Sequence, residues 1–123
     1  MVLTTYYLNQ IRTEVKDDIE ALSLYCAIGT SSTTPTTADT SLGSEVFRDA
    51  IDEVDKSSAV DTIVLSLRVL TTEANGNTIQ ETGLFEVSAA GTAQSHDLLT
   101  SITKTNDIQL YIDHSMEITV TED

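Results

Sequence analysis

The sequence has very few of the residues that mark a disulfide framework, an aromatic core or a membrane span. A single cysteine, Cys26, excludes an internal disulfide, and its place in an apolar run predicts a small buried hydrophobe. Tryptophan is absent and aromatic residues make up 5%, so the core must be aliphatic. No stretch approaches about 20 apolar residues, and the first residues lack a basic start. We therefore expect a soluble protein made in the cytoplasm.

Basic residues are also scarce. The chain has 6 Lys and Arg against 20 Asp and Glu, a formal net charge of -14. Such a surface repels phosphates and anionic lipids, so neither nucleic acid nor membrane is an expected partner. It also repels itself, and at about 1 M salt the Debye length falls to roughly 3 Å and removes most of that penalty. The composition is typical of a halophilic protein, and an ordinary acidic protein is the alternative.

The motifs of common enzyme classes are missing. The sequence contains no Gly-x-Ser-x-Gly elbow, no Gly-rich phosphate loop and no Gly-x-Gly-x-x-Gly fingerprint. Carboxylates are so abundant that no pair of them marks an acid/base dyad. We therefore expect a protein that is not an enzyme and that needs no cofactor.

Two groups of side chains are candidates for binding metal ions, and neither matches a known spacing. His96 and His114 each stand beside an aspartate, but the pairs are far apart in sequence and no cysteine completes a zinc pattern. We expect a surface position for His96 and a strand bend at His114. The acidic residues of segment 49–55 are expected to form a solvated face, with loosely bound Mg²⁺ or Ca²⁺ as the alternative.

The first third of the chain predicts a helix, a strand and a long loop. Apolar residues recur at helical spacing over residues 5–22, with Thr4 or Thr5 as the cap; a short strand before a shorter helix is the alternative. Residues 22–28 alternate as in a strand. Residues 29–44 are rich in Thr and Ser and contain the only proline, Pro35. They predict either a flexible surface loop or an arm along a neighbouring subunit.

The remaining chain predicts mostly strands. Residues 42–51 suggest a short helix or turn, and residues 50–58 an exposed strand or loop. Residues 62–87 predict a hairpin closed by a type I′ turn at Asn75-Gly76, which needs positive φ at both positions. Weaker alternation predicts a strand over residues 93–103 and turns at 89–91 and 104–107. The clearest alternation, over residues 108–120, predicts a half-buried strand interrupted by His114.

These elements predict a mainly β protein: an antiparallel β-sandwich with one short N-terminal helix and an extended loop or arm. At 123 residues the chain is expected to form a single domain, 1–123.

Three segments, in order, resemble small structural proteins of tailed viruses. The first is Ala27-Ile-Gly-Thr-Ser-Ser-Thr-Thr-Pro-Thr-Thr-Ala-Asp-Thr-Ser-Leu42, followed by Glu45 and Arg48. The second comprises Asn75-Gly-Asn-Thr-Ile79 and Glu81-Thr-Gly-Leu-Phe85, and the third is Ile102-Thr-Lys-Thr105. The pattern is similar to the start of tail-collar fibre proteins, which attach fibres to a tail or baseplate. Ser31 and Thr82 depart from it, and the chain lacks the long shaft of a complete fibre.

The resemblance implies an assembly role for its charged and glycine positions. An ion pair between Arg48 and Glu45 or Glu81 would fix the docking of the arm; surface charges are the alternative. Gly83 allows close backbone approach, and Leu84 and Phe85 face opposite sides of a sheet. Either one of them anchors a neighbouring subunit, or both are buried in one sandwich. The expected assembly interface consists of Pro35, Leu42, Glu45, Arg48, Glu81, Gly83, Leu84 and Phe85.

Three functions are open from the sequence. The first is a homo-oligomeric tail, baseplate or fibre-attachment component of a tailed virus, which we expect to be haloarchaeal and whose partners are itself and other virion proteins. The second is a capsid decoration or vertex (turret) protein. The third is a carbohydrate-binding β-sandwich for host recognition, against which the scarcity of aromatic residues counts.

Overall fold

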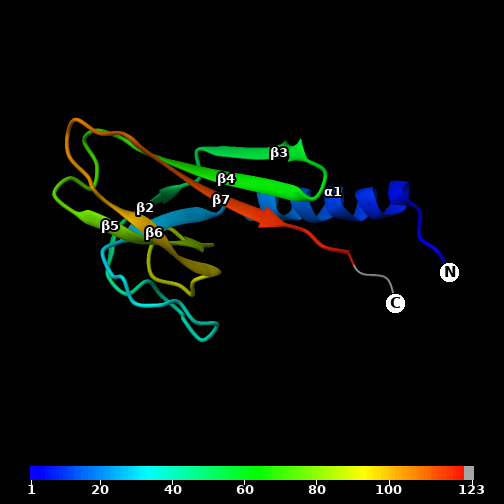
Figure 1. The fold of residues 1–123 in the computed structure, drawn as a ribbon, viewed down its shortest axis with the longest axis horizontal. Coiled ribbons are helices and arrows are strands. Elements are labelled where there is room, and N and C mark those ends of the chain that lie inside the picture. The colour runs from blue at the N-terminus through cyan, green and yellow to red at the C-terminus, as the bar shows by residue number, and fades with distance from the viewer. Residues whose placement is uncertain (121–123) are drawn as a thin grey trace.

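A computed structural model, which describes residues 1–120, contains one helix and seven strands in two antiparallel sheets (Figure 1). The four-stranded sheet has the order β2 (Glu45–Ala50), β1 (Tyr25–Gly29), β5 (Thr78–Phe85), β6 (Ser95–Thr103). The three-stranded sheet has the order β3 (Glu53–Ala59), β4 (Thr62–Val69), β7 (Leu110–Glu117). The predicted mainly β, sandwich-like class is confirmed. Residues 121–123, the end of the predicted domain, lie outside the described part.

The helix, α1 (Thr5–Ala21), begins where the sequence predicts. The Thr4 side chain accepts a hydrogen bond from the Tyr7 backbone N–H, which satisfies one of the free donors of the first turn. The chain leaves the helix through Ser23, whose φ of 52° lies in the left-handed region. No helix among residues 1–120 is long and apolar enough to cross a membrane.

The main core lies between the two sheets and is aliphatic, as the lack of tryptophan predicts. Alternate residues of β4 face inward, from Ile63 to Val69, and each is at most 1% exposed. The four-stranded sheet contributes Cys26, Ile28, Ile79 and Leu84 to the same cluster. Full burial of one such aliphatic side chain stabilises the fold by about 1.5–3 kcal/mol. This shared core fixes which face of each strand points inward.

The predicted hairpin over residues 62–87 is wrong. β4 pairs with β3 and β7, whereas β5 pairs with β1 and β6, so residues 70–77 connect one sheet to the other. Positive φ occurs at Ala74 and Gly76 and not at Asn75, which excludes the predicted type I′ turn. Both strands have a partner on each side, and these non-local pairings override the local Asn-Gly preference.

Two further segments differ from prediction. Residues 45–50, predicted as part of a short helix or turn, form the edge strand β2, whose register pairs Ala27 with Arg48. Pairing with β1, together with the packing of Phe47 against the core, determines this conformation. His114 does not interrupt β7: it is 6% exposed and continues the buried face. The predicted strands over 50–58, 93–103 and 108–120 appear as β3, β6 and the shorter β7.

Candidate functional site

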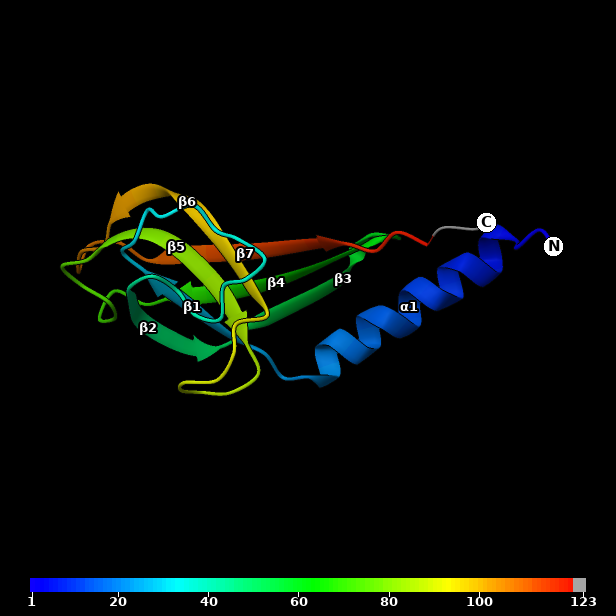
Figure 2. The same ribbon diagram turned by 90° about the horizontal axis from the view of Figure 1, so that it is seen from below.

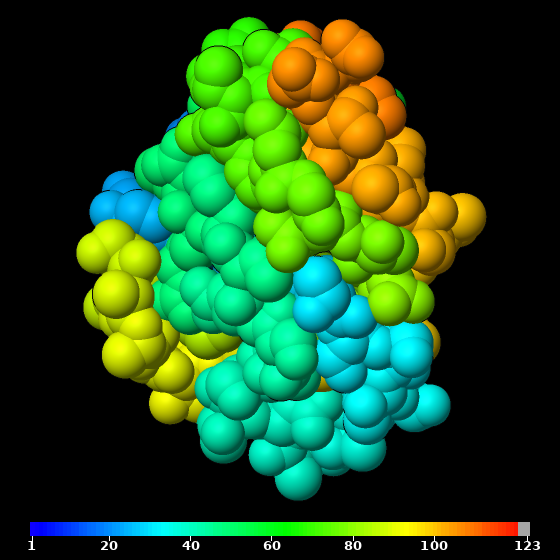
Figure 3. Space-filling view, turned by 90° about the vertical axis from the view of Figure 1, so that its left-hand side faces the viewer, coloured from blue at the N-terminus to red at the C-terminus, as the bar shows by residue number. Residues whose placement is uncertain are grey.

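The outer face of β5 carries the Glu-x-Gly-x-Phe motif and lies under residues 30–44, here called the Thr/Ser loop. Thr82 and Leu84 face the main core, so the alternate residues Glu81, Gly83 and Phe85 point to the opposite side of the sheet. All five are buried. The Thr/Ser loop therefore covers a second, smaller buried region. Figure 3 shows the cyan to blue-green atoms of this loop as a continuous surface at one end of the molecule.

Glu81 attaches the Thr/Ser loop to the sheet. Its side chain is fully buried, and its carboxylate accepts hydrogen bonds from the backbone N–H of Gly43 at 2.7 Å, Ser44 at 2.8 Å and Ser31 at 3.0 Å. Burial raises the pKa of the Glu81 carboxyl. The three backbone bonds and a bond from His96 act in the opposite direction and hold the pKa below its usual value. A buried carboxylate thus binds both ends of the loop.

Two glycines make room for this carboxylate. A Cβ atom at Gly29 would collide with Oε2 of Glu81 and lie 2.5 Å from the Ser44 carbonyl oxygen. A Cβ atom at Gly43 would lie 2.5 Å from Cβ of Ser31. Glycine at these positions lets the backbone approach closely enough for its N–H groups to reach Glu81.

His96 connects Glu81 to the middle of the loop. Its Nε2 lies 2.8 Å from Oε1 of Glu81, and its Nδ1 lies 2.7 Å from Oδ2 of Asp39. Burial lowers the pKa of His96, but its hydrogen bonds to the two carboxylates outweigh burial and raise it. Asp39 also accepts bonds from the backbone N–H and the hydroxyl of Thr36. We call Glu81, His96 and Asp39 the loop anchor.

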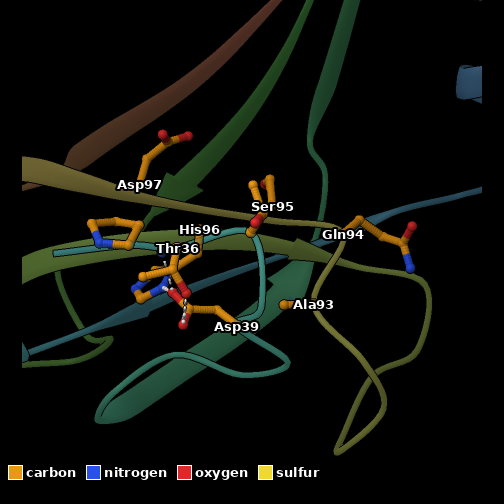
Figure 4. A pocket seen from close by; sticks show the side chains of 9 residues that line it. Thr36, Asp39, Ala93, Gln94, Ser95, His96 and Asp97 are labelled. Atoms are coloured by element: carbon orange, nitrogen blue, oxygen red, sulfur yellow. Dashed lines mark hydrogen bonds and ion pairs between the residues drawn. The ribbon is translucent and has the colours of Figure 1, made fainter. Parts of the chain in front are cut away.

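The loop anchor borders a hollow of about 430 Å³ between the Thr/Ser loop and the start of β6. Figure 4 shows Asp39 and His96 turned toward each other, with Asp97 and Gln94 directed away from them. No Tyr or Phe lines the hollow, so it lacks the stacking surface that sugar sites use; its lining is Pro35, Thr36, Thr37, Asp39, Ala93, Gln94, Ser95, His96 and Asp97.

The structure does not bring the two histidines and their adjacent aspartates together. His96 contacts Asp39 rather than Asp97, and it is largely buried rather than on the surface. His114 lies in the main core, so the two pairs do not form one site. Among residues 1–120, no group of three or more His, Cys, Asp or Glu side chains has an arrangement that could hold a metal ion.

Arg48 forms an ion pair with Glu45, but the pair is not the buried one that the sequence predicts, because the Glu45 side chain is 31% exposed. The guanidinium binds both carboxylate oxygens, at 2.6 and 2.9 Å, and its Cζ atom lies 3.6 Å from the centre of the Phe85 ring. Nη1 also donates to the carbonyl oxygens of Val87 and Ala90. Arg48 therefore fixes the β5–β6 connection, whereas the Thr/Ser loop is attached through Glu81.

The remaining predicted interface residues pack within the chain. Leu84 lies in the main core at 2% exposure, and Phe85 packs with Leu42 on the outer face at 1% exposure. Both side chains are therefore buried within this chain, Leu84 between the two sheets and Phe85 under the Thr/Ser loop. Gly83 allows the predicted close approach, since a Cβ there would lie 2.5 Å from the Ser95 carbonyl oxygen. Pro35 is half-buried at the rim of the hollow.

A buried polar cluster that the sequence did not predict joins the two sheets. Nε2 of His114 lies 3.3 Å from Sγ of Cys26 and 3.0 Å from Oγ1 of Thr82. Burial raises the pKa of the Cys26 thiol to about 11, although a hydrogen bond from Thr82 opposes the shift. Burial also lowers the pKa of His114, against the nearby charges of Asp97 and Asp113. Both groups are neutral near pH 7, so this pair is not an activated nucleophile.

Lys104 joins the second and third motif segments. Its side chain is fully buried, and Nζ donates to Oδ1 of Asn75 at 2.8 Å and to the carbonyl oxygen of Thr105 at 2.9 Å. Its backbone exchanges hydrogen bonds with Gly76 and Asn77. The sequence placed this residue in a turn, and only its position in the motif indicated a special role.

No protein-family model matches the chain, and no curated protein matches it.

Proposed function

We propose that this chain is a non-enzymatic structural protein of a tailed virus, acting as a homo-oligomeric tail, baseplate or fibre-attachment component. The proposal rests on what the motif residues do. Three charged residues of the resembling segments, Glu81, Lys104 and Arg48, each bind backbone groups of connecting segments. These side chains hold loops in fixed positions. A protein whose surface fits against neighbouring subunits needs such fixed loops.

The loop anchor is the single observation that carries this proposal. A loop of Thr and Ser has too little apolar surface to become ordered by itself, because ordering one residue costs roughly 1–2 kcal/mol. Here a buried carboxylate and a histidine hold that loop against the sheet. We infer that the surface of the Thr/Ser loop is the contact region for other virion proteins, and that the partners are proteins rather than nucleic acid or membrane.

A strongly acidic composition supports a particle that assembles at high salt. With a net charge of -14, neighbouring copies repel one another unless salt screens them. We therefore place the proposed virus in a salt-rich environment. Copies of the chain would meet as intact folded subunits made in the host cell.

Immunogold labelling of purified tailed particles tests the proposal. Antibodies raised against the recombinant chain should label one end of the tail, with a small number of copies per particle. Labelling spread over the capsid or at its vertices would replace the tail assignment with the decoration alternative. Absence of the chain from purified particles, measured by mass spectrometry, would overturn both.

A further inference from the structure

Helix α1 carries an apolar stripe that its own chain covers only in part. The stripe residues share one face at helical spacing and are Leu8, Ile11, Val15, Ile19 and Leu22. Leu8, Ile11, Val15 and Ile19 are half-buried, Ile19 packs against the main core, and the one buried residue of α1 is Lys16. Leu22, which caps the end of α1, remains 47% exposed, and Tyr7 in the first turn remains 49% exposed. A stripe of this kind normally faces a partner.

The contacts that attach α1 to the sandwich are mostly polar and lie along one side. Nζ of Lys16 donates to the carbonyl oxygens of Lys56 and Ala59, and Lys56 forms ion pairs with Asp17 and Glu20. Figure 2 shows that α1 extends obliquely beyond the two sheets, so that its first turns lie farthest from them. A helix of 17 residues is only marginally stable in water without apolar packing.

Opposite charges border the two sides of the stripe. At about 100° per residue, Arg12 lies about 60° to one side of Val15, and Asp18 about 60° to the other, with Glu14 beyond it. Within residues 1–120, Arg12 has no carboxylate partner: Nη1 donates to the Asn9 side chain, and the buried Nε has no hydrogen-bond partner. The basic edge of the stripe therefore has no acidic partner in the described part of its own chain. The acidic edge of α1 in a second copy could supply one.

We propose that α1 packs against α1 of a second copy of this chain, in parallel orientation. In a parallel pair, the basic edge of one helix meets the acidic edge of the other. An antiparallel pair would bring like edges together, so the charges favour the parallel arrangement.

The size of the apolar stripe determines how strongly two copies are expected to associate. A helix of this length spans about 25 Å, and one pair of such helices falls short of the roughly 1,000 Å² typical of a stable interface. The association should therefore be weak and require screening of the net charge. This inference rests on the homo-oligomeric part of the proposed function and names the surface that forms the contact.

Disulfide trapping in 2 M KCl tests both the contact and its direction. Leu8→Cys should form a covalent dimer under mild oxidation, much faster than Gln10→Cys on the far face. The native Cys26 is fully buried and should not react. In an antiparallel pair, two copies of residue 8 would be separated by about 20 Å, at a rise of 1.5 Å per residue. A mixed Leu8→Cys and Leu22→Cys dimer in place of the Leu8→Cys dimer would overturn the parallel arrangement.

Sedimentation of the intact chain gives the second test. Ile11→Asp should raise the dissociation constant at least tenfold relative to Gln10→Asp, which adds the same charge on the far face. Arg12→Glu should weaken association, and the double variant Arg12→Glu with Asp18→Arg should restore it. If Arg12→Glu acted only by unfolding the helix, the second substitution would not restore association. If the chain assembles and Ile11→Asp behaves like Gln10→Asp, the helix contact is wrong while the oligomeric function stands. A chain that remains monomeric up to millimolar concentration overturns both.

Discussion

Nε2 of His96 lies 2.8 Å from Oε1 of Glu81, and the two side chains are 6% and 0% exposed. This contact couples the sheet to the middle of the Thr/Ser loop, because the other ring nitrogen of His96 binds Asp39. A charged network is therefore the principal attachment of a loop with little apolar surface. Breaking a buried ion pair by removing one partner generally costs about 3–5 kcal/mol.

The first prediction is that Glu81→Gln lowers the free energy of unfolding by about 3 kcal/mol. The substitution keeps the size of the side chain but turns one acceptor oxygen into an N–H₂ donor that faces backbone donors. The Thr/Ser loop should then be cut by a non-specific protease before the sheets unfold. Urea unfolding and limited proteolysis measure the two effects. Glu86→Gln, which removes the same charge at an exposed position, is the control and should change neither.

The second prediction concerns pH. The folded pKa of His96 is raised because its bonds to Asp39 and Glu81 outweigh burial. Its contribution to stability is therefore fully present below the unfolded value of about 6.5 and is lost as pH rises through the folded pKa. His114 acts in the opposite sense. Burial lowers its pKa, so stability decreases as pH falls from about 6.5 toward its folded pKa.

The slope of unfolding free energy against pH separates the two histidines. The wild-type chain should lose stability as pH rises above about 6.5 toward the folded pKa of His96, and His96→Gln should remove that loss while keeping the acid-side loss. His114→Gln should have the reverse effect. Equal slopes in all three proteins would mean that neither histidine changes its protonation on folding.

The third prediction is that Arg48→Lys lowers the free energy of unfolding by about 1–2 kcal/mol. Lysine keeps the charge but lacks the planar fork that lets Arg48 bind both oxygens of Glu45 while its Cζ atom lies over the Phe85 ring. Arg68→Lys, at an exposed position of β4, is the matched control. If both substitutions cost the same, the planar guanidinium has no special role.

Sequence periodicity predicted single elements well and their partners poorly. Alternation located β4 and β7 because the period of two directly reflects which face of a strand is buried. It could not show that β4 and β5 belong to different sheets, since pairing depends on segments far away in the chain. The edge strand β2 was missed because its local pattern is polar and its pairing with β1 is what makes it a strand.

For the candidate site, too, the sequence predicted which positions are special but not which partners they contact. The motif pointed to Glu81, Gly83 and Arg48 as special positions, and the structure gives each a contact. It could not reveal that Glu81 is fully buried, because its partners are backbone N–H groups about forty to fifty positions away in sequence. The sequence predicted a surface position for His96 for the same reason. Its aspartate partner is Asp39 of the Thr/Ser loop and not the adjacent Asp97.

The fourth prediction is that melting temperature rises steeply with KCl up to molar concentration. The chain has a net charge of -14 and only six basic residues, so most carboxylates lack a positive partner and repel one another. At about 1 M salt the Debye length falls to roughly 3 Å, which removes most of that repulsion. A melting temperature that does not change between 0.05 and 2 M KCl would remove the halophile interpretation while leaving the fold intact.

The last prediction concerns Leu84 and Phe85, for which one interpretation of the sequence places one side chain in the core and the other against a neighbouring subunit. Their contacts now predict that both stabilise the isolated chain, in different regions. Leu84 packs between the sheets, where Leu→Ala typically costs about 2–5 kcal/mol. Phe85 packs with Ala27 and Leu42 under the Thr/Ser loop, where Phe→Ala typically costs about 3–5 kcal/mol.

The two substitutions should differ in which region they loosen rather than in whether they destabilise. Phe85→Ala removes the ring beneath Arg48 and next to Leu42, so hydrogen exchange in the Thr/Ser loop should speed up before exchange in β4 and β7. Leu84→Ala should accelerate exchange in both sheets together, because its cavity opens in the core that they share. Hydrogen exchange followed by mass spectrometry distinguishes these patterns. If Phe85→Ala leaves the isolated chain as stable as the wild type, the packing on the outer face of β5 contributes nothing and the loop anchor alone holds the Thr/Ser loop.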